Sequence, residues 1–420
     1  MPCAWWRSKK ERAVRHALLQ FDLDGVVCYN DRDMTILRIA KEVEMMRKKL
    51  LFLIHALNAA GAQRVLVELV NHINFEQFDV TVQTIYDYGA LKEQLDGRIR
   101  YRSILRFKNR LLKHLCGALL RRVMTPQWVY RHHVEDDYDY AVAYLEGECT
   151  RIVGGCTNLK TKKMAWVHTD FEKLFVCDKV FRNTEEHKKA YQRFDKIVCV
   201  SQGAKRGFER RFGSDWGDKL VVRYNMIDGE RIWAAFQQER ELPVAEDVFS
   251  IVSVGNLRPE KGYDRLLPIC RRLLDEGYRF RLTIVGGGSE YDNVEKLRNQ
   301  LHLQNCVTLL GNQSNPYRYM KQADLFLLCS YSEGFSTVVI ESVILELPPM
   351  VTACSGMDEI LDGGTYGIIV PNSEEGIYEG LKRVLDDPSV LDEYRERLPQ
   401  RRAFFDKDNA LKEIMNLFEE

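Results

Sequence analysis

The chain has 420 residues, more than one hydrophobic core usually supports, and therefore predicts at least two domains. Lys plus Arg and Asp plus Glu both number 61, and a formal net charge of zero argues against a dedicated nucleic-acid-binding protein. The 11 cysteines have no CxxC or paired Cys/His spacing, and no segment has the length and apolar character of a signal peptide or a membrane span, so we expect a reducing, cytoplasmic location.

Residues 1–47 are predicted to be an N-terminal extension, and they contain the sequence FDLDGVV (residues 21–27). An apolar strand that ends in DxDG resembles the first motif of haloacid-dehalogenase phosphatases. That resemblance implies that Asp22 is a nucleophile and that Asp22 and Asp24 bind magnesium. A different domain begins within the next two dozen residues and leaves no room for a phosphatase fold, so we expect a non-catalytic extension.

Residues 48–242 are predicted to form a first Rossmann-like domain with its linker. Short apolar runs alternate here with longer amphipathic stretches, a pattern typical of βαβ units in a parallel sheet. The segments that carry the pattern are LLFLIHAL, QRVLVELVNHI, FDVTVQTIY, YDYAVAYLEG, KMAWVH and KIVCVS.

One region of this first half departs from the alternation. Between residues 98 and 131, eight cations are interleaved with leucines and isoleucine and no acid is present, which predicts a basic amphipathic helix with a break near Gly117. Two interpretations stay open, a solvated helix packed on its own domain and a peripheral attachment to anionic lipid, where each cation contributes roughly 1 kcal/mol. The cations are Arg100, Arg102, Arg106, Lys108, Arg110, Lys113, Arg121 and Arg122.

Residues 243–398 are predicted to form a second Rossmann-like domain, after a polar linker at residues 236–247. Its expected strands are FSIVSVG, FRLTIVGGG, CVTLLG and DLFLLCS, and the helices between them are DRLLPICRRLLDEG, NVEKLRNQL and NPYRYMKQA. Residues 399–420 are expected to be a helix that crosses back to the first domain.

Two glutamates follow the last of these strands. In SEGFSTVVIES (residues 332–342), Glu333 lies in a tight turn and Glu341 about two turns into the following helix. At about 1.5 Å rise per residue the two carboxylates should stand on the order of 10 Å apart. A pair that flanks one glycosidic bond is closer, at about 5 Å. The spacing therefore predicts that the two acids hold opposite ends of an extended ligand.

The same region supplies groups that can bind an anion. Free N–H groups at the helix start suit a diphosphate, and they belong to Phe335, Ser336 and Thr337. In GNLRPEKG (residues 255–262), Arg258 and Lys261 can both point over the carboxyl edge of the sheet, where open α/β sheets bind ligands. Two cations can stabilise a departing diphosphate, so we expect that no metal and no other cofactor is required.

These motifs in this order resemble the C-terminal half of glycosyltransferase family 4, which has the GT-B fold of two facing Rossmann-like domains around a central cleft. The segments are GNLRPEKG, VGGGSE, LLGNQSNPYRYMKQADLFLLCSYSEGFSTVVIES and SGMDEILDGGTYGIIVP, and the E-x7-E signature is intact. The resemblance covers nearly all of residues 49–415. It implies a retaining transferase in which Arg258 and Lys261 hold the diphosphate, Glu341 the ribose hydroxyls and Glu333 the sugar hydroxyls.

The first half resembles the family more loosely. LNAAGAQRVLVEL is similar to the family's Gly-Gly-Ala-Glu loop and helix, with Ala for Gly and Gln for Glu, and Gly61 still lets the backbone approach a phosphate. MAWVHTDF resembles the aromatic-x-His segment and implies that His168 lies in the cleft near the reacting sugar. VVRYNMID resembles the segment before the linker, where Asn225 has a structural role.

The sequence therefore predicts transfer of a sugar, with retention of configuration, from a nucleotide-diphosphate donor to a hydroxyl acceptor. We expect a UDP-sugar first and GDP-mannose second, and the resemblance to bacterial enzymes of cell-surface polysaccharide assembly implies a glycan or lipid-linked acceptor, with the protein peripheral on the inner face of the cell membrane. The alternatives are a catalytically inactive sugar-nucleotide-binding scaffold, a sugar-nucleotide isomerase of similar fold, and the phosphatase. Asp22 and Asp24 also have the spacing of the metal-binding DxD of the other major glycosyltransferase fold, but no matching single-domain pattern follows.

Overall fold

The computed structural model describes residues 47–58, 60–106, 116–117, 119–120, 123–134, 137–171, 180–237 and 248–419. Lys49–Ile73 and Val80–Glu420 belong to one compact unit. The other unit comprises Met1–Lys48 and Asn74–Asp79, and within it the N–H of Lys48 donates to the carbonyl of Gln77 (2.9 Å). The FDLDGVV segment lies outside the described residues.

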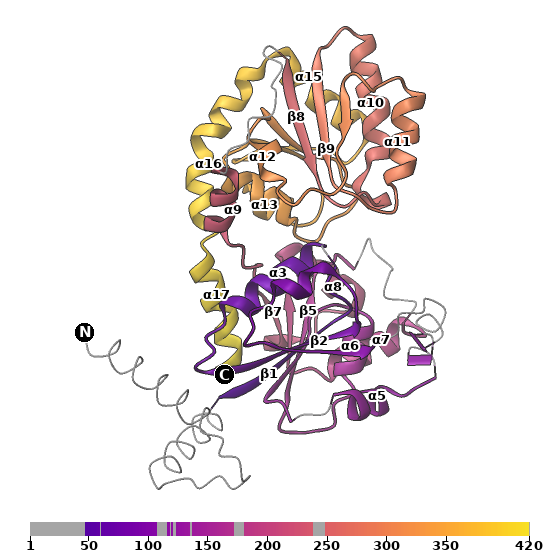
Figure 1. Ribbon diagram of the computed structural model, residues 1–420, viewed down its shortest axis with the longest axis vertical. Coiled ribbons are helices and arrows are strands. Elements are labelled where there is room, and N and C mark those ends of the chain that lie inside the picture. Colours follow the sequence, from indigo (N-terminus) through magenta and orange to yellow (C-terminus); the bar gives the residue numbers. More distant parts are fainter. Residues whose placement is uncertain are drawn as a thin grey trace, which may run out of the picture. The chain divides into compact units, whose positions relative to one another are not determined.

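Within the described residues the first sheet has seven strands in the order β3-β2-β1-β4-β5-β6-β7. Figure 1 labels β1, β2, β5 and β7 among them. The pairs β1–β4, β2–β3, β4–β5, β5–β6 and β6–β7 are parallel. The strands are β1 (Lys48–Ile54), β2 (Phe78–Tyr86), β3 (Arg100–Leu105), β4 (Tyr140–Ala143), β5 (Lys162–Val167), β6 (Lys196–Cys199) and β7 (Leu220–Val222). The helices are α3 (Gly61–His72), α5 (Pro126–His133), α6 (Glu148–Val153), α7 (Thr184–Gln192) and α8 (Gln202–Phe212).

Burial and capping explain these elements. Residues 50–54 of β1 are all fully buried, as expected for a central strand covered on both faces. Three helices of the first half begin at a residue whose side chain accepts an N–H of the first turn, which satisfies a donor that has no partner inside the helix. These caps are Thr125 for α5, Asn183 for α7 and Ser201 for α8.

The structure corrects one prediction for this half. Residues 100–105, assigned above to the start of a basic amphipathic helix, form the edge strand β3. Arg100 and Arg102 are tolerated there because an edge strand keeps solvent on one side, and Tyr101 anchors the strand by a hydrogen bond with Thr84 (2.9 Å). Most of the remaining basic segment, residues 107–115, 118 and 121–122, lies outside the described residues.

The second sheet has six strands in the described residues, in the order β10-β9-β8-β11-β12-β13, and all of its pairs are parallel. The strands are β8 (Phe249–Val254), β9 (Phe280–Val285), β10 (Val307–Leu309), β11 (Leu325–Leu328), β12 (Pro349–Thr352) and β13 (Ile368–Val370). In each sheet the strand order reverses between the first and the fourth strand, at β8/β11 and β1/β4. Open α/β sheets bind ligands beyond the carboxyl ends of the strands at such a point.

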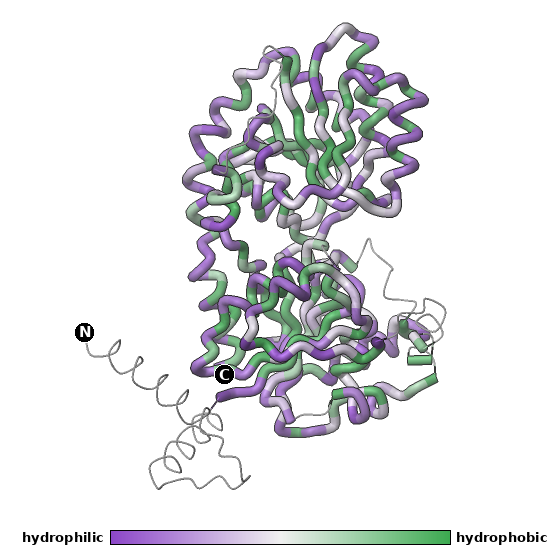
Figure 2. The backbone as a smooth tube through the Cα atoms, viewed as in Figure 1, coloured by the Kyte–Doolittle hydropathy of each residue, from purple (hydrophilic) through white to green (hydrophobic). Residues whose placement is uncertain are grey.

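Helices cover both faces of the second sheet. Helix α10 packs against α11 and α15, whereas α13 packs against α9 and α16. The helices are α9 (Gly229–Gln237), α10 (Tyr263–Asp275), α11 (Tyr291–Gln300), α12 (Tyr317–Met320), α13 (Thr337–Ile344), α14 (Met357–Leu361), α15 (Glu374–Asp386), α16 (Asp392–Phe404) and α17 (Lys407–Met415). Figure 2 shows apolar strands between helices whose outer residues are polar, so each sheet is the centre of its own core.

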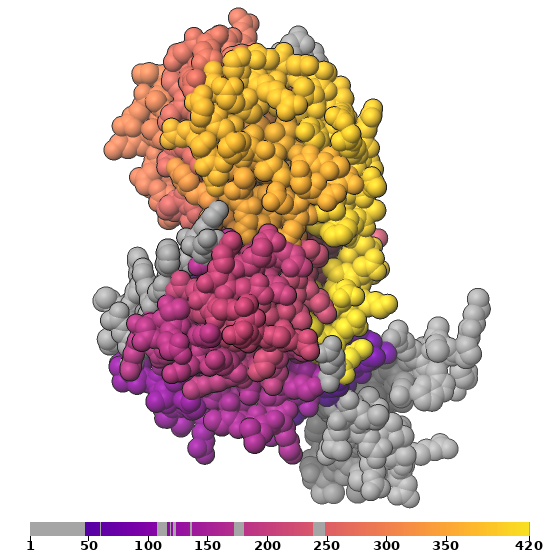
Figure 3. All heavy atoms as spheres, turned by 180° about the vertical axis from the view of Figure 1, so that it is seen from behind, coloured from indigo at the N-terminus to yellow at the C-terminus, as the bar shows by residue number. Residues whose placement is uncertain are grey.

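The C-terminal segment connects the two sheets. Helix α16 packs against α13, and beyond α17 the ring of Phe418 contacts Phe52 of β1 (6.0 Å between centroids) and Tyr140 of β4 (5.3 Å). Figure 3 shows this segment in yellow, reaching the residues of the first half. Residues 236 and 237 of the predicted linker belong to α9, and residues 238–247 lie outside the described residues.

No helix among the described residues is long and apolar enough to cross a membrane. The cysteines of the described ranges form no disulfides with one another, and most of them are buried.

Candidate active site

A cavity of about 1820 Å³ lies beyond the carboxyl ends of the central strands of both sheets. Its walls come from the loops after β1, β4, β5, β8 and β11 and from the first turns of α3 and α13. The structure brings every predicted site residue to this cavity. They are Gly61, His168, Arg258, Lys261, Glu333, Phe335, Ser336, Thr337 and Glu341.

Lys261 and Glu333, from loops 72 residues apart, meet in the cavity wall. The ammonium group of Lys261 donates to Oε1 of Glu333 at 2.6 Å, and the two side chains are only 16% and 12% exposed. Gly262 makes this approach possible, because its φ of 72° is left-handed and a Cβ there would lie 2.2 Å from the carbonyl oxygen of Cys329. A mostly buried ion pair at the ligand-binding edge can exchange partners with a charged ligand.

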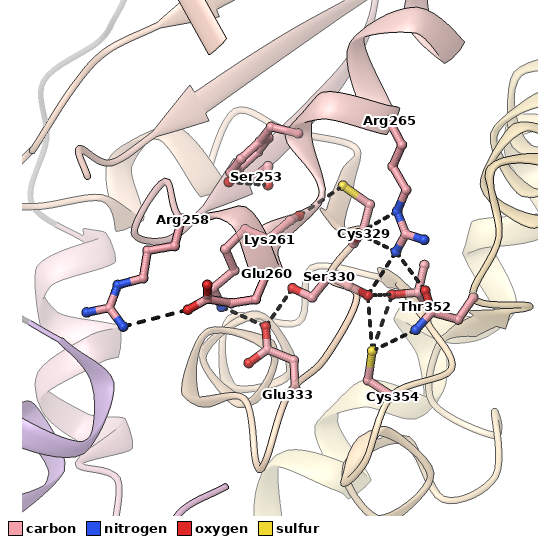
Figure 4. A network of polar contacts seen from close by, with 12 residues as sticks. Ser253, Arg258, Glu260, Lys261, Arg265, Cys329, Ser330, Glu333, Thr352 and Cys354 are labelled. Atoms are coloured by element: carbon pink, nitrogen blue, oxygen red, sulfur yellow. Dashed lines mark hydrogen bonds and ion pairs between the residues drawn. The ribbon is translucent and has the colours of Figure 1, made fainter. Parts of the chain in front are cut away.

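The carboxylate of Glu333 is held by neighbours of the same loop (Figure 4). The Ser330 hydroxyl donates to Oε1 of Glu333 at 2.6 Å. Behind it, the buried guanidinium of Arg265 donates to the carbonyls of Cys329 and Ser330 and to the side-chain oxygen of Asn372, at 2.7–3.2 Å. This network fixes the end of β11 and therefore the direction in which Glu333 points.

Arg258 differs from Lys261 because it remains largely exposed. Its side chain is 46% exposed and lies 3.7 Å from a carboxylate oxygen of Glu260. An exposed ion pair of this kind contributes at most about 1 kcal/mol, so Arg258 can turn toward an anion in the cavity at little cost.

Glu341 lies closer to the helix start than the sequence predicted. It is the fifth residue of α13, just over one turn from the beginning, because the helix starts at Thr337. Burial raises the pKa of Glu341 to about 7, and the nearby Glu68 carboxylate adds to this shift while Arg64 and Arg231 oppose it. The group therefore changes protonation near neutral pH.

His168 occupies the end of β5. Its backbone N–H donates to Oε1 of Glu146 at 2.5 Å, and Thr169 donates to the same oxygen through its N–H (2.9 Å) and its hydroxyl (3.1 Å). Burial lowers the pKa of His168, although Glu146 opposes that effect, so the imidazole is neutral at pH 7. Within the described residues its Nε2 is buried and has no hydrogen-bond partner, which is uncommon for a buried polar atom.

The remaining predicted residues are backbone elements at two helix starts. Gly61 begins α3, whose N-cap Ala60 provides no side-chain cap, and a Cβ at Gly61 would lie 3.6 Å from the Thr337 hydroxyl. Ser336 is the N-cap of α13 and likewise makes no side-chain cap hydrogen bond. Phe335 stacks on Tyr224 with 5.2 Å between ring centroids. Two uncapped helix starts therefore border the cavity, where first-turn N–H groups lack helical partners.

Several residues of the site were not predicted from the sequence. Glu146 and Ser330 each lie in the loop just beyond the carboxyl end of a strand, which is a usable signal in a parallel sheet. The ion pair of Glu68 on α3 with Arg231 on α9 has no such signal, because 163 residues separate the partners. Asn225 is buried and also borders the cavity. Among the described residues no group of three or more His, Cys, Asp and Glu could hold a metal ion.

Two Rossmann-like halves that border one cavity, with a Lys–Glu pair and a neutral histidine in its walls, define a protein of the GT-B fold. Comparison with known proteins agrees. Residues 235–402 match the family model for glycosyl transferases group 1. The protein is a glycosyltransferase, and its second half is similar to the glycosyl transferases of group 1.

Its relatives are bacterial and archaeal glycosyltransferases. One is the N-acetylgalactosamine-N,N'-diacetylbacillosaminyl-diphospho-undecaprenol 4-alpha-N-acetylgalactosaminyltransferase of Campylobacter jejuni, 28% identical over 371 residues that cover 86% of this chain and 96% of that protein. Among solved structures, Anabaena HepE in complex with UDP and glucose has a TM-score of 0.68 at 18% identity and covers 89% of this chain and 100% of its own. The sucrose-phosphate synthase of Thermosynechococcus elongatus has a TM-score of 0.68 at 16% identity, covering 89% and 98%.

Proposed function

We propose that the protein is a retaining glycosyltransferase of family 4 that moves a sugar from a nucleotide diphosphate to a hydroxyl of a lipid-linked or polysaccharide acceptor in cell-surface glycan assembly. The observation that carries the proposal is the Lys261–Glu333 pair, which shares one cavity with Glu341 and His168. Charged groups at the switch points of two facing sheets suit a ligand with a base, a diphosphate and a sugar.

The donor is a UDP-sugar in this proposal, with GDP-mannose as the second candidate. Support comes from the solved relative HepE, which was crystallised with UDP and glucose. The acceptor assignment is supported by the name of the Campylobacter jejuni relative, which describes transfer to a diphospho-undecaprenol-linked glycan.

Each charged residue has a role along the extended donor. Lys261 and Arg258, with the N–H groups at the start of α13, neutralise the diphosphate as it departs. Glu341 accepts hydrogen bonds from the ribose hydroxyls, and Glu333 accepts them from the sugar. The contact of Lys261 with Glu333 supports an arrangement in which this cation lies between the diphosphate and the sugar.

The chemistry needs no protein nucleophile. The acceptor oxygen attacks the anomeric carbon on the face that the diphosphate leaves, the carbon–oxygen bond to the phosphate breaks, and a leaving phosphate oxygen takes the acceptor proton. The neutral imidazole of His168 orients the sugar through its unpartnered Nε2, an electrostatic role as positive charge develops on the ring.

We also propose a peripheral location on the inner, anionic face of the cell membrane. Among the described residues near the basic segment, Val123 is 69% exposed and Trp128 is 43% exposed, and α5 ends in Arg131, His132 and His133. Exposed apolar residues beside cations are typical of a surface that contacts anionic lipid.

A thermal-shift screen of nucleotide sugars tests the donor site first. A donor at 100 times its dissociation constant should stabilise the protein by roughly 2.7 kcal/mol, and UDP-sugars should give the largest shift. The donor identified is then incubated with and without an acceptor. Product that forms only with an acceptor supports a transferase, whereas product without one indicates an isomerase, and binding without any product indicates an inactive scaffold.

A further inference from the structure

A carboxylate from the second half caps a helix of the first half. Glu359, in α14, accepts the backbone N–H groups of Gln202 and Gly203, both at 2.7 Å. These are the first two residues of α8, and their N–H groups have no partner inside the helix. The third, Ala204, donates to the Ser201 hydroxyl at 2.9 Å. The helix is therefore capped by its own N-cap and by a charge from a residue more than 150 positions away.

Three glycines next to this cap, Gly203, Gly356 and Gly334, lie in close contact with neighbouring segments. We call them the glycine seam. A Cβ on Gly203 would lie 2.2 Å from the Ser355 hydroxyl and 3.0 Å from the nitrogen of Gly356. A Cβ on Gly356 would lie 2.5 Å from the carbonyl oxygen of Gly334, and one on Gly334 would lie 1.9 Å from that of His168. The seam thus leads from the capped helix to the predicted catalytic histidine with no room for side chains.

Two further contacts tie the same cap to the cavity. The Tyr224 hydroxyl donates to Glu359 at 3.3 Å, while its ring stacks on Phe335 with an interplanar angle of 24°. The Ser201 hydroxyl lies 3.3 Å from the Gly334 carbonyl and donates to it. Gly334 and Phe335 directly follow Glu333, so contacts around Glu359 reach the loop that presents the Glu333 carboxylate.

The backbone around Glu359 is held in place by an arginine of α16. The guanidinium of Arg401, on α16, donates to the carbonyl of Ile360 at 2.8 Å and also to the carbonyl of Glu359. The neighbouring acid Asp358 is exposed and makes no side-chain hydrogen bond or ion pair within the described residues. Only one of these two adjacent acids is therefore built into the contact with the first half.

We propose that Glu359 is a positioning residue, which caps α8 from the second half and, through the glycine seam, sets the approach of the Glu333 loop to His168. It touches none of the reacting atoms. The inference rests on the proposed function for its catalytic consequence, but the contact itself can be tested without any substrate.

The experiment compares Glu359→Ala and Glu359→Gln with the wild type and with the control Asp358→Asn. Hydrogen exchange is measured in the absence of ligand for the amides of Gln202 and Gly203 and for residues 332–337. We expect exchange at both places to be on the order of tenfold faster in Glu359→Ala, with a smaller increase in Glu359→Gln, because an amide oxygen can still accept one N–H. Asp358→Asn should match the wild type.

Turnover on the donor found by the screen gives the second readout. Glu359→Ala should lower kcat by on the order of tenfold with little change in KM. The residues that bind the donor are all retained, and only the position of the Glu333 loop relative to His168 changes. Gly203→Ala should lower kcat likewise, because its Cβ would lie 2.2 Å from the Ser355 hydroxyl and 3.0 Å from the nitrogen of Gly356, and the seam would have to shift.

Unchanged exchange at both places in Glu359→Ala would overturn the proposal, whatever the protein catalyses. Faster exchange at Gln202 and Gly203 alone, with residues 332–337 and kcat unaffected, would overturn the link to the cavity. If both segments exchange faster but no nucleotide sugar is turned over by the wild type, the contact stands and the proposed function fails.

Discussion

At the residue scale, Glu341 is the cavity residue whose pKa is raised into the neutral range. Its pKa of about 7 results from burial, reinforced by Glu68, so the carboxyl is half protonated near neutral pH. Two ribose hydroxyls donate better to a carboxylate than to a neutral carboxyl group. Donor binding should therefore be coupled to loss of this proton.

We predict that a UDP-sugar binds the wild type on the order of tenfold more weakly at pH 6 than at pH 8, because below the pKa of Glu341 each pH unit adds a tenfold cost of deprotonation. Calorimetric titration across this range measures the effect. Glu341→Gln should bind more weakly at pH 8 and show a flat profile. If donor affinity in Glu341→Gln depended on pH as steeply as in the wild type, the proton released on binding would belong to another group.

The same shift predicts how stability depends on pH. A carboxyl whose pKa is raised from 4.5 to about 7 contributes stability that is complete below pH 4.5 and is lost as pH rises through 7. Urea denaturation should therefore show Glu341→Gln to be more stable than the wild type at pH 8, by up to ~3 kcal/mol, but not at pH 4.5. If the two proteins differed equally in free energy of unfolding at pH 8 and at pH 4.5, the raised pKa of Glu341 would be contradicted.

The Lys261–Glu333 pair predicts non-additive changes in stability. Lys261→Met should destabilise the protein by ~1–3 kcal/mol because Glu333 is left in a mostly buried position without its cation, and Glu333→Gln should also destabilise it. The double variant should lose clearly less than the two singles together, which a double-mutant cycle in urea measures. Arg258→Gln is the control, expected to change stability by less than ~0.5 kcal/mol while weakening donor binding. Strict additivity would show that the pair is not coupled.

At the element scale, the sequence predicted the alternation of strands and helices well, because hydrophobic periodicity is a local property. The segment FDVTVQTIY coincides with β2, and the GNLRPEKG and SEGFST loops lie at strand ends as expected. The prediction of a basic helix was wrong at residues 100–105, which form β3. It gave more weight to the positive charges than to Tyr101 and Ile104, which favour a strand. Charged residues are common on both exposed helices and edge strands, so composition alone does not separate them.

The parts of the site that the sequence did not reveal depend on contacts between distant segments. Glu359 stands in the SGMDEIL motif quoted for the family resemblance, but its role as a cap on α8 requires the structure. Glu146 is similar, since its three donors come from the following strand end. The structure gathers the predicted residues in one cavity, and their individual roles remain predictions.

The basic segment beyond β3 carries the membrane prediction. Replacing Arg106, Lys108, Arg110 and Lys113 with Gln should weaken binding to anionic liposomes, since each cation contributes roughly 1 kcal/mol near such a surface, and added salt should weaken wild-type binding. Sedimentation with phosphatidylglycerol vesicles measures this. The control removes four cations of the second half, Arg279, Arg281, Lys296 and Lys321, and should bind as the wild type does. A wild type that stays in the supernatant at low salt would show that the segment does not attach to lipid.

At the scale of the whole molecule, the GT-B fold and the glycosyltransferase assignment are confirmed, and the role of metal is the next question. We predict that transfer survives excess EDTA, because Arg258, Lys261 and the start of α13 supply the charge that a metal would supply elsewhere. A known manganese-dependent transferase, treated with the same EDTA, serves as the control and should lose its activity. Complete loss of activity, restored by manganese or magnesium, would instead direct attention to Asp22 and Asp24.

The proposed function makes one claim about the whole cleft, that both halves act together on one nucleotide sugar with retention of configuration. Nuclear magnetic resonance of the product formed from a UDP-α-sugar and a lipid-linked acceptor tests this most directly, through the coupling constant of the new anomeric proton. We expect an α-linked product from the wild type, and at least tenfold slower formation by Glu341→Ala and Lys261→Ala. A β-linked product, or wild-type rates in both variants, would contradict it.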